Sequence, residues 1–126
     1  MTLFFDRDVG TAVPKALEIL RIQVEYHQKY FPQNSPDDVW MPAVGQWGWT
    51  IIGHDSQHHA MPNELSAIKQ YNLGCFYLWG AEASRWEKMR CLARAYDRIV
   101  TADVTTGRPF IYRVTRTGRL TSVPIP

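Results

Sequence analysis

The sequence is poor in cysteine and has no long apolar stretch, and these two absences limit what the protein can be. Among its 126 residues only Cys75 and Cys91 are cysteines, and their spacing fits neither a zinc nor a redox motif, so we expect reduced packing residues. The longest apolar runs, Thr50–Ile52 and Cys75–Trp79, are far shorter than the roughly 20 residues that cross a bilayer. No basic segment precedes Asp6, so a secretory signal is not expected either. We therefore expect a cytoplasmic protein with no membrane association.

An excess of one charge is also absent overall, although the charges are unevenly distributed. The net charge is +2, and the hydrophobic fraction of 45% is that of an ordinary folded protein, so we expect one domain over residues 1–126. Residues 1–84 contain five Lys or Arg against nine Asp or Glu, whereas residues 85–126 contain nine against three. This division suits a protein that concentrates cations in one region and binds a polyanion in another. Scattered solubilising charge is the alternative.

Short β-prone runs alternate with helical patterns along the chain. We expect strands over residues 3–5, 24–26, 49–52 and 75–78, and residues 109–114 and 120–123 should form either a terminal hairpin or one strand with a tail. We expect helices over residues 12–23, 36–44, 62–70 and 84–100. The order β-α-β-α-β-α-β-α-β with short connections predicts an α/β fold, an open, mainly parallel β-sheet flanked by helices.

Two helix starts are marked by capping residues. Ser35 is the expected N-cap of one helix, with Pro36 at its first helical position. Ser84 and Glu87 have the spacing of a capping box at the start of the longest helix.

The tryptophans have two possible uses, core packing and stacking on unpaired bases. Trp40, Trp49 and Trp86 occur at core spacings, so we expect these three to be buried. For Trp47 and Trp79 both uses stay open.

Two aspartates directly follow expected strands. Asp6 and Asp55 occupy such positions, and Asp37 begins the helix that leads into the second of those strands. Ligands of open α/β sheets bind at the carboxyl ends of the strands, and clustered carboxylates stay ionised only beside a cation, of which hard oxygen ligands favour Mg²⁺ or Mn²⁺. Such a metal can activate water and stabilise charge on a phosphate, as phosphodiester hydrolysis requires. The alternatives are a helix-dipole role for Asp37 and strand-end turns for the other two.

Five segments together resemble the PIN-like domains of VapC-type toxins. They are Phe4–Gly10, Asp37–Met41, Gly48–Asp55, Pro62–Glu64 and Arg108–Val114. The resemblance covers nearly the whole chain in order. It implies an endoribonuclease that cleaves single-stranded RNA with Mg²⁺ or Mn²⁺, and commonly the toxin of a toxin–antitoxin pair that an antitoxin protein inhibits.

The resemblance also assigns the acidic residues. Asp6, Asp37 and Asp55 match the first three acidic ligands and are the predicted catalytic and metal-binding residues. Asp38 stays an alternative to Asp37, because the two differ by one position. The fourth acid of the family has no clear counterpart, and its candidates are Glu64, Asp97 and Asp103.

A second family shares the first motif. The segment Phe4–Val9 also resembles haloacid-dehalogenase-type phosphatases, in which Asp6 would be the nucleophile and Asp8 a general acid. That family has a late acidic pair, which this sequence lacks, so Asp8 is expected to be a loop residue or an additional metal ligand.

Two further alternatives stay open. His54, His58 and His59 flank Asp55 and suggest zinc, although their spacing matches no known zinc pattern. A non-catalytic PIN-like binding module, with an acidic set too incomplete for chemistry, is the alternative outside the enzymes.

The arginines of the last third form the predicted RNA-binding surface, because guanidinium groups pair well with phosphates. An acidic antitoxin is the other partner that such a surface suits, and a homodimer stays open. The residues assigned to RNA are Arg90, Arg94, Arg98, Arg108 and Arg113.

Overall fold

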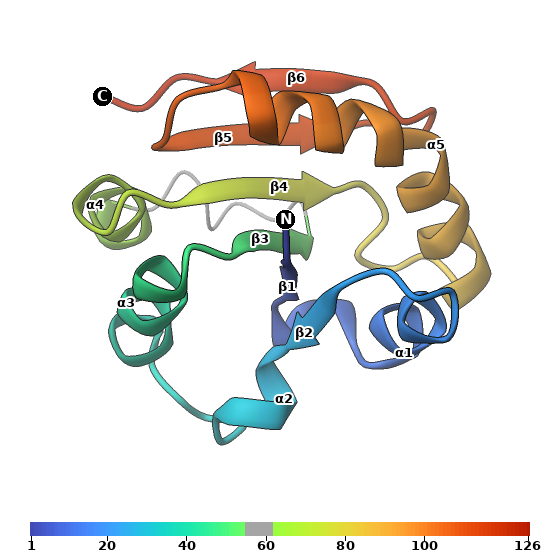
Figure 1. Cartoon of the computed structure of the whole chain (residues 1–126), viewed down its shortest axis with the longest axis horizontal. Helices are drawn as coiled ribbons and strands as arrows, with labels where there is room; N and C mark the ends of the chain where they lie inside the picture. Colours follow the sequence, from blue (N-terminus) through green and yellow to red (C-terminus); the bar gives the residue numbers. More distant parts are fainter. Residues whose placement is uncertain (55–61) are drawn as a thin grey trace.

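The computed structural model describes residues 1–54 and 62–126, in which one six-stranded sheet is flanked by helices (Figure 1). The strand order is β2-β1-β3-β4-β5-β6, with parallel neighbours from β2 to β5 and an antiparallel β6. The predicted open, mainly parallel α/β sheet is confirmed. The strands are β1 Leu3–Phe5, β2 Val24–Tyr26, β3 Thr50–His54, β4 Gly74–Leu78, β5 Phe110–Val114 and β6 Leu120–Val123.

The helices cover both faces of this sheet and connect its parallel strands. No helix in the described ranges is both long and apolar enough to cross a bilayer. The short helix α2 was not predicted from the sequence. The helices are the 3-10 helix η1 Arg7–Val9, α1 Ala12–Ile19, α2 His27–Tyr30, α3 Asp37–Trp47, α4 Pro62–Gln70 and α5 Arg85–Thr105.

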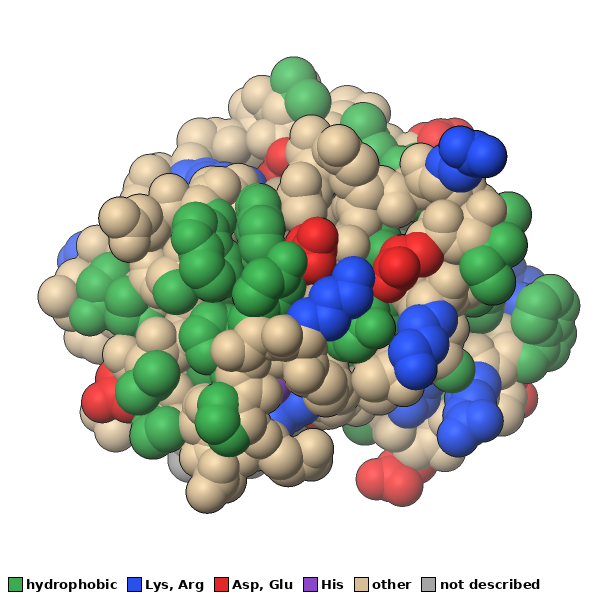
Figure 2. Space-filling model, turned by 60° about the horizontal axis from the view of Figure 1, so that its bottom comes forward, with side chains coloured by type: hydrophobic (Ala, Val, Ile, Leu, Met, Phe, Trp, Pro, Cys, Tyr) green, Lys and Arg blue, Asp and Glu red, His purple; other side chains and the backbone are tan. Residues whose placement is uncertain are grey.

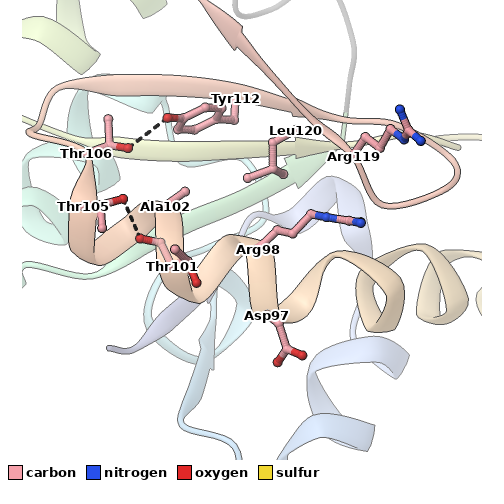
Figure 3. Close-up of a pocket in the computed structure, with 9 residues that line it drawn as sticks. All are labelled: Asp97, Arg98, Thr101, Ala102, Thr105, Thr106, Tyr112, Arg119 and Leu120. Carbon is pink, nitrogen blue, oxygen red and sulfur yellow. Dashed lines mark hydrogen bonds between the residues drawn. The ribbon is translucent and has the colours of Figure 1, made fainter.

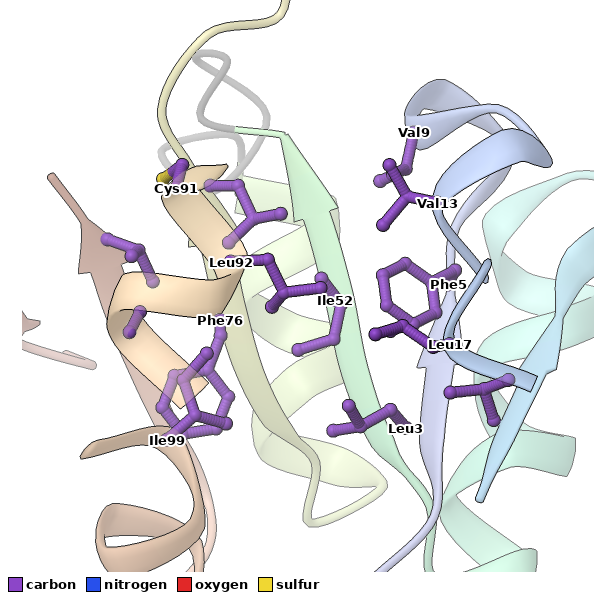
Figure 4. Packing of buried hydrophobic residues seen from close by; sticks show 14 of the residues in the cluster. Leu3, Phe5, Val9, Val13, Leu17, Ile52, Phe76, Cys91, Leu92 and Ile99 are labelled. Atoms are coloured by element: carbon purple, nitrogen blue, oxygen red, sulfur yellow. The ribbon is translucent and has the colours of Figure 1, made fainter. Parts of the chain in front are cut away.

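Alternate residues of the strands supply two separate cores. Leu3 and Phe5 of β1 pack with residues of α1 and α5 on one face of the sheet (Figure 4). Phe4, between them, packs on the other face with residues of α3 and α4. Because both faces are covered, β3 and β4 are buried along their whole lengths, as the continuous apolar runs predicted.

The two predicted helix starts differ in outcome. Helix α3 begins at Asp37 with Pro36 as the N-cap, so the assignment of Ser35 as N-cap was wrong by one position. Ser35 instead lies buried in the turn before the helix, where its N–H donates to the carbonyl of Pro32 at 3.0 Å. Ser84 is the N-cap of α5, and its hydroxyl accepts a hydrogen bond from the N–H of Glu87 at 3.2 Å, which confirms the predicted capping interaction.

The tryptophans that were expected in the core differ in their burial. Trp40 is 1% exposed and lies in the core as expected. Trp86 was expected in the core but is 68% exposed. The helical spacing was right, but α5 turns Leu92 and Ile99 toward the sheet while its first turn leaves Trp86 in solvent.

Both cysteines are free and buried, as expected. Burial raises the pKa of the Cys75 thiol to about 12, so this group stays protonated at neutral pH.

Candidate metal centre

The turn that follows β1 brings two aspartates to the carboxyl end of the sheet. Asp6 is the N-cap of η1: its Oδ1 accepts a hydrogen bond from the N–H of Arg7 at 2.7 Å, and its own N–H donates to the carbonyl of Ile52 at 2.9 Å. Asp8 Oδ2 accepts a hydrogen bond from the N–H of His54 at 3.4 Å. Both residues are thereby held beside the end of β3.

Gly53 provides room at this position. A Cβ atom there would lie 3.2 Å from the ring of Tyr77 and 3.8 Å from Asp8 Oδ1. The ring of Tyr77 thus packs across Gly53, close to the carboxylate of Asp8, where a larger residue would displace them.

The environment of Asp6 disfavours its charged form. Burial, followed by the negative charge of Asp8, raises the pKa of the Asp6 carboxyl to about 7, and the N–H and the charge of Arg7 oppose this only in part. A carboxylate held so close to another is stabilised by a bound cation. The pair therefore has the electrostatics expected of cation ligands.

Asp37 belongs to the same electrostatic environment, whereas Asp38 is exposed. Arg7 Nη2 lies 3.7 Å from Asp37 Oδ1, and Trp40 Nε1 donates to the same oxygen at 3.0 Å. The charge of Asp37 also contributes to the raised pKa of Asp6, after burial and Asp8. These contacts distinguish Asp37 from its neighbour in the sequence.

Arg7 connects the aspartate turn to the following elements. Its Nη1 donates to the carbonyl of Ser35 at 2.8 Å and lies 3.0 Å from His27 Nε2. Since a guanidinium has no acceptor, His27 Nε2 must be the acceptor. Burial, and then the charge of Arg7, lower the pKa of His27, in agreement with a neutral imidazole.

The three candidates for a fourth acid lie in different places. Glu64 is 9% exposed in the first turn of α4. Burial raises the pKa of the Tyr77 hydroxyl, and the negative charges of Glu64 and Asp6 both contribute to this rise. Asp97 is exposed on α5, and Asp103 is engaged in an ion pair described below. Of the three candidates, Glu64 is the one whose charge acts on the same hydroxyl as the charge of Asp6.

Part of the predicted site, namely Asp55, His58 and His59, lies outside the described residues. His54 is buried, and its Nδ1 lies 3.4 Å from the carbonyl of Leu78. Within residues 1–54 and 62–126, no group of three or more His, Cys, Asp or Glu side chains is arranged to hold a metal ion. Mg²⁺, however, is commonly held by one or two carboxylates together with waters and substrate phosphates. Oxygen ligands alone, as Asp6 and Asp8 offer, fit Mg²⁺ or Mn²⁺ better than zinc.

A family model described as a PIN like domain matches residues 1–80. The chain belongs to the PIN-like domain family. PIN domains are commonly nucleases that use Mg²⁺ or Mn²⁺. The matched region of this PIN-like domain includes every predicted acid except Asp97 and Asp103. Neither the search of curated proteins nor that of solved structures finds a match.

The arginine residues assigned to RNA have different environments in this PIN-like domain. Arg108, assigned to RNA from the sequence, instead forms internal contacts: its Nη2 lies 3.2 Å from Asp103 Oδ1 and donates to Thr50 Oγ1 at 2.9 Å, and its Nη1 donates to the carbonyl of Trp49. These partners lie at the amino end of β3, opposite the aspartates. These internal contacts favour a structural role for Arg108 over the predicted contact with RNA. The other members, Arg90, Arg94, Arg98 and Arg113, are exposed.

The basic groups nearest the aspartates were missed by the sequence analysis. A pocket of about 450 Å³ lies beside Asp8, with Arg7, Lys15, Arg85 and Lys88 among its lining residues. These residues come from η1, α1 and α5, so only the folded chain brings them together.

A larger pocket, of about 690 Å³, lies along the second half of α5 (Figure 3). Thr101, Thr105, Thr106 and Tyr112 line it with hydroxyl groups, and Thr106 Oγ1 lies 2.8 Å from the hydroxyl of Tyr112. Asp97, one of the candidates for the fourth acid, lines this pocket, whereas Asp6, Asp8, Asp37 and Glu64 do not.

Aromatic rings are also partly exposed, near α2. Tyr30 and Trp47 are each 44% exposed, and Trp47 and Trp49 have ring centroids 4.7 Å apart. Figure 2, in which the α2 side of Figure 1 comes forward, shows hydrophobic side chains gathered beside charged ones. Trp47 therefore keeps both uses open, packing and stacking.

Proposed function

We propose that this PIN-like domain is a metal-dependent endoribonuclease that hydrolyses phosphodiester bonds of single-stranded RNA. The observation that carries the proposal is the placement of Asp6 and Asp8, which lie together beside the carboxyl end of β3. Membership of the family supports the same reaction, because PIN domains are commonly nucleases.

The metal-binding residues in this proposal are Asp6, Asp37 and Asp55, with Asp8 and Glu64 as additional ligands. Bound Mg²⁺ or Mn²⁺ would lower the pKa of a coordinated water and stabilise negative charge on the phosphate. Arg7 holds Asp37 toward the aspartate turn, and the backbone contacts of Asp6 and Asp8 keep both carboxylates at the end of the sheet. These contacts support the proposal, because positioning of a cation requires carboxylates held in place by their neighbours.

The activity is tested with a panel of single-stranded RNAs in Mg²⁺, Mn²⁺ or EDTA. We expect cleavage only with metal, and a loss of at least about 100-fold for Asp6→Asn, since removal of a ligand disables the site. Asp38→Asn, an equally conservative change at an exposed neighbour, is the control. A phosphatase would instead release phosphate from small monoesters, and that result would reject the nuclease proposal.

The biological role that we propose is that of the toxin in a toxin–antitoxin pair, with a small antitoxin protein as its partner. It is supported by the sequence resemblance and by the exposed arginines of α5, which suit an acidic partner segment. Expression of the chain should arrest growth, Asp6→Asn should abolish the arrest, and a neighbouring small reading frame should relieve it. Arrest by Asp6→Asn at the same protein level would contradict a toxic nuclease.

One observation favours a second candidate, a non-catalytic PIN-like module. Among the described residues no set of three metal-binding side chains is assembled. In that case neither Mg²⁺ nor Mn²⁺ binds or supports cleavage, while the folded protein still binds a protein partner.

A further inference from the structure

Cationic side chains meet the acidic site at one pocket. Lys15 of α1 and Arg85 and Lys88 of α5 line it, together with Asp8 and Arg7. Arg7 is engaged with His27, Ser35 and Asp37, which leaves three cations of this pocket for an external anion. A strongly basic pocket whose wall includes a predicted metal-binding turn suits a phosphate group.

Lys88 lines the same pocket as Asp8, whose carboxylate accepts a hydrogen bond from the N–H of His54 at the end of β3. An anion held by Lys88 would therefore lie next to the aspartate turn. The pocket shares Asp8 and Arg7 with the acidic site.

We propose that Lys15, Arg85 and Lys88 form the track that leads a single RNA strand to the acidic site, with its phosphates on the three cations. The proposal rests on the proposed function and deepens it, because it names the surface that presents the substrate. It also differs from the sequence prediction, which placed the RNA on Arg90, Arg94, Arg98, Arg108 and Arg113.

The test measures binding without cleavage. A fluorescein-labelled oligouridylate of about 12 nucleotides, a length within the range of known single-strand sites, is titrated with the full chain in EDTA, and anisotropy is recorded at several salt concentrations. We expect Arg85→Ala and Lys88→Ala each to weaken binding and to reduce the slope of log affinity against log salt by about 0.7, the value for one phosphate contact of a single strand.

A matched control accompanies these variants. Lys69→Ala removes the same charge from the end of α4. It should bind like the wild type. The proposal is overturned if the wild type does not bind the oligonucleotide, or if Lys69→Ala weakens binding as much as Lys88→Ala. Because EDTA prevents cleavage, binding on this track by a chain that never cleaves RNA with metal would reject the nuclease proposal alone.

Discussion

Arg7 and Asp37 face each other across the acidic site, with 3.7 Å between Arg7 Nη2 and Asp37 Oδ1. The pair joins the turn after β1 to the first turn of α3. Trp40 Nε1 holds the same Asp37 oxygen at 3.0 Å. The position of Asp37 therefore depends on contacts that Asp38, exposed on the same helix, does not share.

This difference predicts which of the two aspartates matters. Asp37→Asn should reduce metal-dependent RNA cleavage by about 10- to 100-fold, the usual effect of removing a group that holds or supports a metal ligand. Asp38→Asn should leave the rate unchanged. Initial rates at saturating Mn²⁺ distinguish them, and equal losses in both variants would show that the register of Asp37 was misassigned.

The raised pKa of Asp6 predicts a stability change with pH in the metal-free protein. Between its ordinary pKa of 3.8 and about 7, Asp6 is protonated in the folded chain but ionised in the unfolded one, so this residue's contribution to stability falls as pH rises. The lowered pKa values of His27 and His54 act in the opposite direction, because these residues take up protons on unfolding at low pH.

A comparison with Asp6→Asn isolates the aspartate. In urea unfolding with EDTA, we expect the variant to be more stable than the wild type by about 2–4 kcal/mol at pH 8, and similar in stability near pH 4. Saturating Mn²⁺ should reduce the gap by stabilising only the wild type. A wild type as stable as the variant at pH 8 would contradict the described environment of Asp6.

Glu64 should be the additional acid that supports cleavage. Glu64 is nearly buried, and its charge and that of Asp6 both contribute to the raised pKa of Tyr77, after burial. Glu64→Gln should therefore lower the Mn²⁺-dependent rate of cleavage by about 10-fold or more. Asp97→Asn, on the exposed face of α5, should not. Rates at several Mn²⁺ concentrations check this, and the opposite ranking would reject Glu64.

Arg108 should matter for stability and not for RNA. Arg108→Ala leaves Asp103 and the hydroxyl of Thr50 without their half-buried partner, so we expect the free energy of unfolding to fall by about 3 kcal/mol. The affinity for the labelled oligouridylate should not change. If the variant unfolds like the wild type but binds RNA more weakly, the role first assigned from the sequence was right.

Much of the fold was predictable because its signals are local. The buried strands β3 and β4 are continuous apolar runs, and the short apolar run of β1 placed Asp6 at the carboxyl end of the sheet. The internal contacts of Arg108 and the exposure of Trp86 were not predicted, for a shared physical reason. The arginine's partner Thr50 lies 58 residues away in the sequence. Helical spacing gave the period of α5 but not which of its turns contacts the sheet.

The cationic pocket illustrates the same limit. Lys15 and Lys88 belong to helices far apart in the chain, and their common position beside Asp8 is set by the packing of α1 and α5 on one face of the sheet. The excess of basic residues after residue 84 indicated a polyanion but not the surface that receives it.

The most direct test of the central claim, that the acids after β1 hold a divalent cation, is calorimetric titration of the wild type with Mn²⁺. We expect one binding event that weakens at least about 10-fold in Asp6→Asn and in Asp8→Asn but not in Asp38→Asn. Below pH 7 it should release a proton, because Asp6 must ionise to bind. No Mn²⁺ binding by the folded wild type, or equal binding by Asp6→Asn, would contradict it.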